Sequence, residues 1–126
     1  MKPNSESLLV LVAGPYRSGT DDDPTLIVEN LAAMNRVALK LFRAGHLPIL
    51  GEWFALPLIQ TAGSHQVGDP IFNEIFHPVS ERLVRRCDAC LRIGGPSAGV
   101  DSMVELARSL GQPIFYSLEE LVGTAV

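Results

Sequence analysis

Basic residues are not in excess in this sequence. Its 126 residues include 10 Lys and Arg against 14 Asp and Glu, which gives a net charge of −4, and the two signs are interspersed. A surface that binds a nucleic-acid polymer normally carries clustered Lys and Arg. We therefore expect no nucleic-acid polymer as a partner, although one or two well-placed donors would be enough to hold a small anion.

Long apolar runs are also missing. Residues 1–7 show neither the basic region nor the apolar stretch of a signal peptide. No apolar run approaches the roughly 18 residues that span a bilayer. We therefore expect no membrane partner and a cytoplasmic location.

Cysteine is scarce, with only Cys87 and Cys90 in the spacing C-x-x-C. One pair supplies too few ligands for a structural zinc site. Redox pairs favour a helix N-terminus, where the thiolate is stabilised, whereas this pair ends a predicted helix and enters a strand. We expect two buried, reduced thiols, and neither a metal nor a cofactor.

The pattern that is present is an alternation of strand and helix signals along one domain, residues 1–126. The continuous apolar run at 8–13 is typical of a strand that is buried on both faces. The other predicted strands are 46–50, 89–93 and 114–116, and the predicted helices are 24–44, 54–61, 70–86 as two pieces with a break, 101–110, and a short one after Ser117. This order predicts an α/β fold, a small doubly wound parallel sheet of four to five strands with helices on both faces.

In such sheets ligands bind beyond the carboxyl ends of the strands, where the strand order reverses. The loops expected there are 16–23, 51–53 and 94–101, and these are the polar and glycine-rich loops of the sequence. Their position predicts a ligand site at this edge of the sheet.

The loop 94–99 precedes a predicted helix and contains the candidate ligand contacts Gly95, Ser97 and Gly99. Glycines and a serine before a helix N-terminus form a cradle of backbone N–H groups for an anion. The loop matches neither the dinucleotide fingerprint nor the Walker P-loop. A flexible connection between strand and helix is the plain alternative.

Glu105 follows this loop as a candidate nucleophile or acid–base group. Ser102 and Glu105 also have the spacing of a capping box, and spacing alone favours that structural role. Asp101, a further candidate catalytic carboxylate, lies four residues before Glu105. It shares a helical face with Glu105 if it is helical, and otherwise it is an N-cap.

The first loop presents Tyr16 and Arg17 directly after the first strand. An arginine there could hold a phosphate through two parallel hydrogen bonds, and Ser18 and Gly19 could add donors. The alternative is an exposed arginine in a mobile loop.

The second loop contains Glu52 and Trp53. Glu52 is a candidate second carboxylate for glycosidic chemistry, and Trp53 could stack on a planar base. A surface carboxylate and a core tryptophan are the alternatives. The run 21–23 of three aspartates is expected to cap and solvate the following helix rather than to bind a metal.

Several short segments resemble nucleoside 2-deoxyribosyltransferase-like proteins, which include the 2′-deoxynucleoside 5′-phosphate N-hydrolases. These segments are LVAGPY at 11–16, AGHLP at 44–48, CDACLRI at 87–93, PSAG at 96–99, ELA at 105–107 and GQP at 111–113. The resemblance covers most of the chain and implies a flavodoxin-like sheet and cleavage of an N-glycosidic bond. It also implies a homo-oligomer, because familiar members complete their sites with residues of a neighbouring subunit.

Carried over position by position, the resemblance implies that Glu105 attacks the anomeric carbon of deoxyribose. It implies that Tyr16, in the loop that opens at Gly14, orients this glutamate. Arg17 and the pair Ser97 and Gly99 match phosphate-contacting positions. The implied partner is a small-molecule nucleoside or nucleotide.

The leading hypothesis is N-glycosidic cleavage or deoxyribosyl transfer on a nucleoside or nucleoside 5′-monophosphate through a glutamate nucleophile. A nucleotide-binding module without activity is the alternative. It is favoured by Ser80, which stands approximately where active members carry an aspartate. A phosphoribohydrolase of the cytokinin-activating type ranks lower, because its Pro-Gly-Gly-x-Gly-Thr run is absent.

Overall fold

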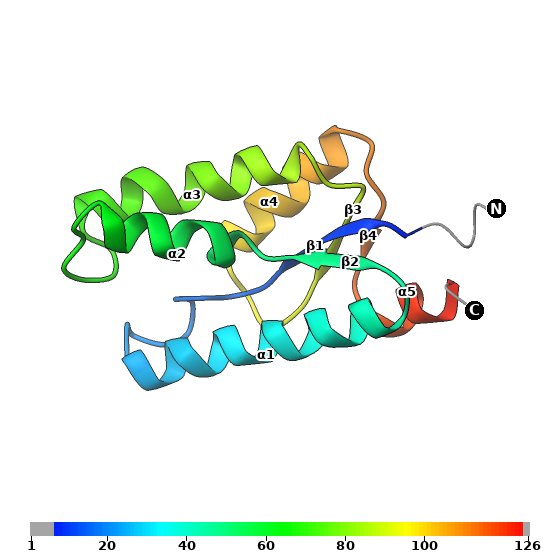
Figure 1. Ribbon diagram of the computed structural model, residues 1–126, viewed down its shortest axis with the longest axis horizontal. Helices are drawn as coiled ribbons and strands as arrows, with labels where there is room; N and C mark the ends of the chain where they lie inside the picture. The colour runs from blue at the N-terminus through cyan, green and yellow to red at the C-terminus, as the bar shows by residue number, and fades with distance from the viewer. Residues whose placement is uncertain (1–6, 125–126) are drawn as a thin grey trace.

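The apolar run near the N-terminus forms a central strand of the sheet. In the computed structural model, which describes residues 7–124, this strand is β1 and its residues 10–13 are buried. The elements in chain order are β1 (Leu9–Ala13), α1 (Pro24–Arg43), β2 (Leu47–Ile49), α2 (Gly51–Thr61), α3 (Pro70–Val84), β3 (Ala89–Arg92), α4 (Ala98–Ser109), β4 (Ile114–Phe115) and α5 (Leu118–Thr124). Figure 1 shows their arrangement.

The sheet has four strands in the order β2-β1-β3-β4, and all neighbours are parallel. Leu11 lies between Ile49 on β2 and Cys90 on β3. The chain steps from β1 to β2 on one side and then returns to β3 on the other side. The order therefore reverses at β1 and β3, and the predicted parallel α/β sheet of flavodoxin-like type is confirmed.

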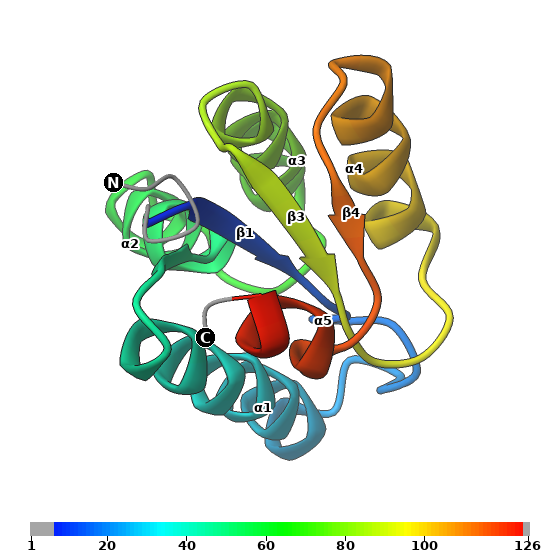
Figure 2. The same cartoon turned by 90° about the vertical axis from the view of Figure 1, so that its right-hand side faces the viewer.

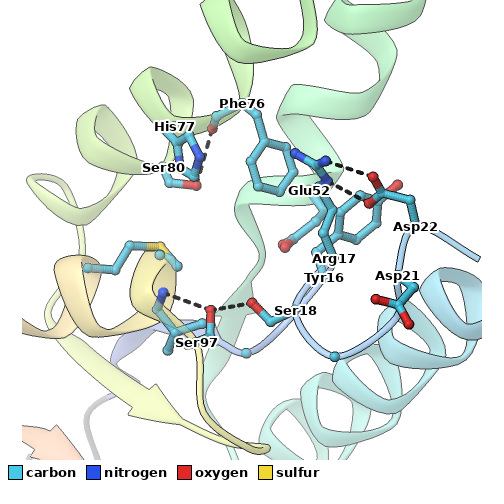
Figure 3. A pocket seen from close by; sticks show the side chains of 15 residues that line it. Tyr16, Arg17, Ser18, Asp21, Asp22, Glu52, Phe76, His77, Ser80 and Ser97 are labelled. Atoms are coloured by element: carbon cyan, nitrogen blue, oxygen red, sulfur yellow. Dashed lines mark hydrogen bonds and ion pairs between the residues drawn. The ribbon is translucent and has the colours of Figure 1, made fainter. Parts of the chain in front are cut away.

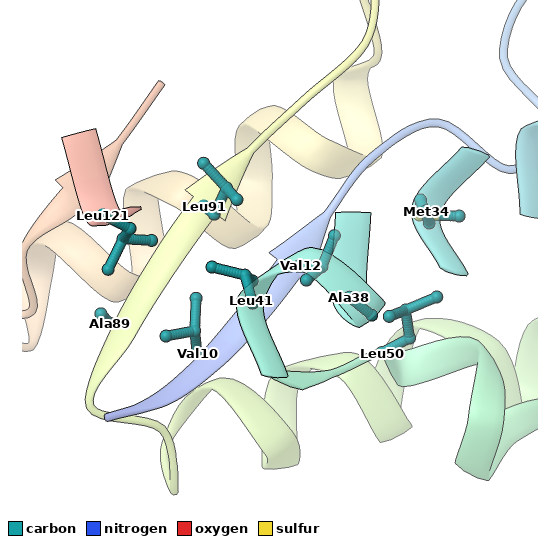
Figure 4. Packing of buried hydrophobic residues seen from close by; sticks show 9 residues of the cluster. All are labelled: Val10, Val12, Met34, Ala38, Leu41, Leu50, Ala89, Leu91 and Leu121. Atoms are coloured by element: carbon teal, nitrogen blue, oxygen red, sulfur yellow. The ribbon is translucent and has the colours of Figure 1, made fainter. Parts of the chain in front are cut away.

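Helices cover both faces of this sheet (Figure 2). On one face α1 and α5 cover an apolar cluster (Figure 4) that consists of Val10, Val12, Met34, Ala38, Leu41, Leu50, Ala89, Leu91 and Leu121. On the other face α4 and the end of α3 cover a second cluster, formed by Leu11, Ala13, Val84, Cys87, Cys90, Val100, Val104 and Ala107. The alternation of β1 side chains between the two clusters follows from the period of two in a strand.

The start of α1 is as predicted. Asp23 is the N-cap, its side chain accepts a hydrogen bond of 2.9 Å from the N–H of Thr25, and Pro24 occupies the first helical position. Proline is favoured there because its missing N–H would have no partner inside the helix.

Three other helix predictions were wrong. The break expected in 70–86 is absent, since α3 runs through Pro78 and buries Phe72, Ser80 and Val84. An interior proline costs the helix a hydrogen bond, and the buried side chains on both sides of Pro78 stabilise the helix against that loss. The other two helices begin earlier than expected, α2 at Gly51 and α4 at Ala98.

The two cysteines are free and buried, as predicted. Burial raises the pKa of the Cys87 thiol to about 11 and that of the Cys90 thiol to about 12. Since the thiolate is the reactive form, neither residue is a nucleophile near neutral pH. Across residues 7–124, no helix is both long and apolar enough to cross a membrane.

Candidate functional site

A cavity of about 400 Å³ lies at the carboxyl edge of the sheet, where the strand order reverses (Figure 3). This volume is in the range of small-molecule sites. Its walls come from the loop after β1, the first turn of α2, the middle of α3 and the first turns of α4. The lining residues are Gly14, Tyr16, Arg17, Ser18, Gly19, Asp21, Asp22, Glu52, Phe76, His77, Ser80, Ser97, Gly99, Val100 and Met103.

Glu52 is the buried carboxyl of this cavity. It lies in the first turn of α2, directly after Gly51, and is only 7% exposed. No ion pair among the described side chains involves it. Burial without a nearby cation disfavours the charged form, and it raises the pKa of Glu52 to about 7. Near neutral pH this carboxyl can therefore both give and take a proton.

Tyr16 faces the same space. Its pKa is raised first by burial and then by the charge of Glu52. Its ring centroid lies 5.3 Å from that of Phe76, which in turn lies 4.7 Å from Phe72 and 5.4 Å from the His77 ring. The rings of Tyr16, Phe76 and His77 form an aromatic wall of the cavity, on which a planar group or the apolar face of a sugar can pack, whereas Phe72 is buried beside them.

A polar wall lies opposite. The Ser18 hydroxyl donates a hydrogen bond of 2.9 Å to the Ser97 hydroxyl oxygen. Ser97 is the N-cap of α4, and its Oγ accepts from the N–H of Val100 at 3.3 Å. Gly99 follows in the first turn. Ser97 therefore caps α4 at the edge of the cavity, and anion binding by this loop stays a prediction.

Arg17 is not an exposed arginine without a partner. Its Nε and Nη2 atoms donate to the two carboxylate oxygens of Asp22, each at 2.9 Å. Its guanidinium also lies 5.6 Å from the centroid of the Phe72 ring. The hydrogen bond with Arg17 lowers the pKa of Asp22. In this structure the predicted phosphate-binding arginine is therefore occupied by a carboxylate of its own loop.

Glu105, the predicted nucleophile, is not in the cavity. Its side chain is 72% exposed and forms an ion pair with Arg108 one turn later. Because α4 begins at Ala98, Glu105 lies two turns into the helix rather than at its start. The capping-box alternative was also wrong, because Ser97 and not Ser102 is the N-cap.

In this turn of α4, the residue that lines the cavity is Met103. Successive helical residues are rotated by about 100°, so Met103 and Glu105 point in nearly opposite directions. A thioether does not ionise and cannot replace a carboxylate. Glu105, the glutamate of α4, therefore does not line this cavity.

Three further candidates lie outside the cavity. Asp101 is 67% exposed at its side chain and pairs with Arg92 at 3.0 Å. The indole N–H of Trp53 donates to Asn35, and the ring is partly exposed rather than a core or cavity residue. Gly95 lines a smaller neighbouring cavity of about 210 Å³.

The other predicted residues line the main cavity together: Gly14, Tyr16, Arg17, Ser18, Gly19, Glu52, Ser97 and Gly99. Phe76 and His77 also line the cavity, although neither was a candidate by sequence. Phe72, Phe76 and Ser80 recur every four residues, which places them on one face of a helix. Because a break was expected near Pro78, these three residues were not read as one face of a single helix.

Within residues 7–124, no group of three or more His, Cys, Asp or Glu side chains could hold a metal ion. Comparisons of the sequence with protein-family models and with curated proteins found no match. The chemistry of the cavity has to follow from its own side chains, which are one buried carboxyl, a pair of bonded hydroxyls, a paired arginine and an aromatic wall.

Proposed function

We propose that the cavity binds a nucleoside or nucleoside 5′-monophosphate and cleaves its N-glycosidic bond, with Glu52 as the reacting carboxyl in place of Glu105. The observation that carries this proposal is the buried Glu52, with a pKa of about 7, between an aromatic wall and a pair of hydroxyls. A flat base suits the wall of Tyr16 and Phe76. The sugar hydroxyls suit Ser18 and Ser97.

A buried carboxyl that is partly protonated near neutral pH suits a general acid. The protonated Glu52 gives its proton to a nitrogen of the base as the bond between that nitrogen and C1′ breaks. A water molecule then adds its oxygen to C1′ and returns one proton to the Glu52 carboxylate. The reaction consumes one water and releases the free base and the free sugar. If a second base adds to C1′ through its nitrogen instead of water, and gives the proton of that nitrogen to the Glu52 carboxylate, the outcome is deoxyribosyl transfer.

The test is to incubate the purified protein with 2′-deoxynucleosides and their 5′-monophosphates and to measure the free base by chromatography. The variant Glu52→Gln keeps the shape of the side chain but cannot give the proton, so we expect a loss of about 100-fold or more in rate. Glu105→Gln is the matched control, and its rate should equal that of the wild type. Absence of base release by the wild type, or full activity of Glu52→Gln, would sink the catalytic proposal.

Binding without turnover is the second candidate, and the residues at two cavity positions favour it. Met103 on α4 and Ser80 on α3 line the cavity without a carboxylate, and its other carboxylates, Asp21 and Asp22, lie on the loop after β1. This candidate predicts that a nucleoside or nucleotide raises the melting temperature, because a ligand that binds only the folded state stabilises it. No free base should then appear.

We also propose that the protein forms a homo-oligomer and that it is cytoplasmic. Phe54 and Leu58 on α2 are 49% and 52% exposed and border an apolar groove together with Leu83 on α3. Exposed apolar surface of this kind supports self-association. The free thiols of Cys87 and Cys90 fit a reducing compartment.

A further inference from the structure

The walls of the main cavity carry more negative than positive charge. The ionisable side chains that line it are Tyr16, Arg17, Asp21, Asp22, Glu52 and His77. Arg17 is the single permanently charged cation in this set, against three carboxyls. A ligand with two negative charges would meet repulsion here that an uncharged ligand would not.

One donor edge of Arg17 is already engaged in an internal pair. The fork formed by its Nε and Nη2 atoms holds both oxygens of Asp22. Its guanidinium also touches the backbone at Gly68, where an added Cβ would lie 2.6 Å from Nη2. A phosphate uses the same fork geometry as a carboxylate. To bind through this Nε and Nη2 fork, a phosphate must displace Asp22.

The N-terminus of α4 is the feature that would attract an anion. The N–H of Val100, one of its first backbone donors, already bonds to the Ser97 hydroxyl oxygen. The Ser18 hydroxyl proton is directed to Ser97 as well. These internal bonds leave fewer free donors for a phosphate at this end of the cavity.

We infer that Asp22 is a specificity-determining residue that sets the cavity against a 5′-phosphate. It holds Arg17 in an internal pair and adds its own negative charge, so the cavity accepts an uncharged nucleoside in preference to the 5′-monophosphate. This inference rests on the proposed nucleoside site. It narrows the substrate class to nucleosides and assigns the selection to one side chain.

The variant Asp22→Asn tests the inference with little disturbance of the backbone. Asp22 has a φ of 59°, in the left-handed region, and asparagine tolerates that region as aspartate does. Asp101→Asn is the matched control, because it breaks an arginine–aspartate pair that lies outside the cavity. Asp21→Asn removes a cavity carboxylate but leaves Arg17 paired.

Binding is measured by calorimetric titration with the common 2′-deoxynucleosides, their 5′-monophosphates and inorganic phosphate. The wild type should bind a deoxynucleoside more tightly than its monophosphate. Asp22→Asn should tighten the binding of the monophosphate and of inorganic phosphate about tenfold and leave the nucleoside unchanged. Asp21→Asn should give a smaller gain, and Asp101→Asn should give none.

Two results would overturn the inference. One is a wild type that prefers the monophosphate, and the other is a gain for Asp21→Asn as large as that for Asp22→Asn. The double variant Arg17→Gln, Asp22→Asn should lose most of the gain, because the released arginine is then absent. If no nucleoside binds to any variant while Asp22→Asn still gains affinity for inorganic phosphate, the proposed function fails and the role of Asp22 stands.

Discussion

The Ser18 hydroxyl lies 2.9 Å from the Ser97 hydroxyl oxygen, and this hydrogen bond joins the loop after β1 to the N-cap of α4. The two residues are 79 positions apart in the chain. Parallel strands bring them together because β1 and β3 are neighbours whose carboxyl ends meet at one edge of the sheet. The two serines have different structural roles, since only Ser97 caps a helix.

Replacement of Ser97 by alanine should therefore cost more stability than replacement of Ser18. Ser97→Ala removes the cap on the N–H of Val100, and we expect the free energy of unfolding to fall by about 1 kcal/mol. Ser18→Ala keeps that cap and should cost less than half as much. Urea denaturation of both variants measures the difference, and equal losses would contradict the capping role.

Glu52 should make the stability of the protein depend on pH. Its pKa rises from 4.5 in the unfolded chain to about 7 in the folded protein. Between these values the folded state keeps a proton that the unfolded state has lost, so the free energy of unfolding falls as pH rises. The full loss is about 3 kcal/mol above the folded pKa.

This dependence is measured by urea denaturation at about pH 5 and about pH 8, on either side of the folded pKa. Glu52→Gln should remove most of the fall, because its side chain does not titrate. Glu105→Gln is the control, since that side chain is largely exposed. If the free energy of unfolding of Glu52→Gln falls with pH as much as that of the wild type, a group other than Glu52 causes the fall and the prediction is wrong.

The start of α2 should tolerate no side chain at position 51. A Cβ at Gly51 would lie 2.6 Å from the Ser80 hydroxyl oxygen and 3.6 Å from the Ser80 Cβ. Gly51→Ala should thus destabilise the protein by about 1 to 3 kcal/mol, as overpacked sites do. Ser80→Ala removes the clashing oxygen and should recover most of that loss in the double variant.

The coupling between the two substitutions is obtained from the unfolding free energies of the two single variants and the double variant. Losses that simply add would show that the oxygen of Ser80 is not the obstacle. Because Glu52 follows Gly51 directly, Gly51→Ala should also weaken nucleoside binding. Ser80→Ala alone leaves position 51 unchanged and serves as the comparison.

The proposed homo-oligomer should depend on α2. Phe54→Glu places a charge beside the apolar groove that Leu58 and Leu83 border, and we expect it to lower the sedimentation coefficient to that of a single chain. Phe42 on α1 is 63% exposed and lies outside this groove, so Phe42→Glu is the matched control. A single chain for the wild type, or dissociation by both variants, would reject an interface at α2.

Local signals in the sequence were enough to predict the parallel sheet. The apolar run at 8–13 marks a strand covered on both sides, and the pair Asp23 and Pro24 marks a helix start. Both signals can be read from a few consecutive residues. An N-cap bonds to an N–H two or three positions later, and a strand that is buried on both faces is a continuous apolar run. The glycine-rich loops likewise predicted the edge at which the cavity lies.

The direction of Glu105 could not be predicted in this way. A shift of three or four residues in the start of a helix changes which residues lie in its first turn, and both Ser97 and Ser102 are acceptable N-caps by sequence. In the folded protein the N-cap is Ser97, because a helix that begins there buries Val100, Val104 and Ala107 against the sheet. That choice places Met103 at the cavity and Glu105 in solvent.

The protonation of Glu52 and the pairing of Arg17 also depend on the assembled molecule. Both residues were candidates by position alone, since each follows a strand of the parallel sheet. The pKa of Glu52 is raised to about 7 by burial, and the residues that bury it come from several elements. The sequence alone was sufficient for the parallel strands, the start of α1 and the edge of the sheet at which the cavity lies. Which carboxyl lies in the cavity and which carboxylate holds the arginine were set by tertiary packing, because burial and charge pairing depend on residues far apart in the chain.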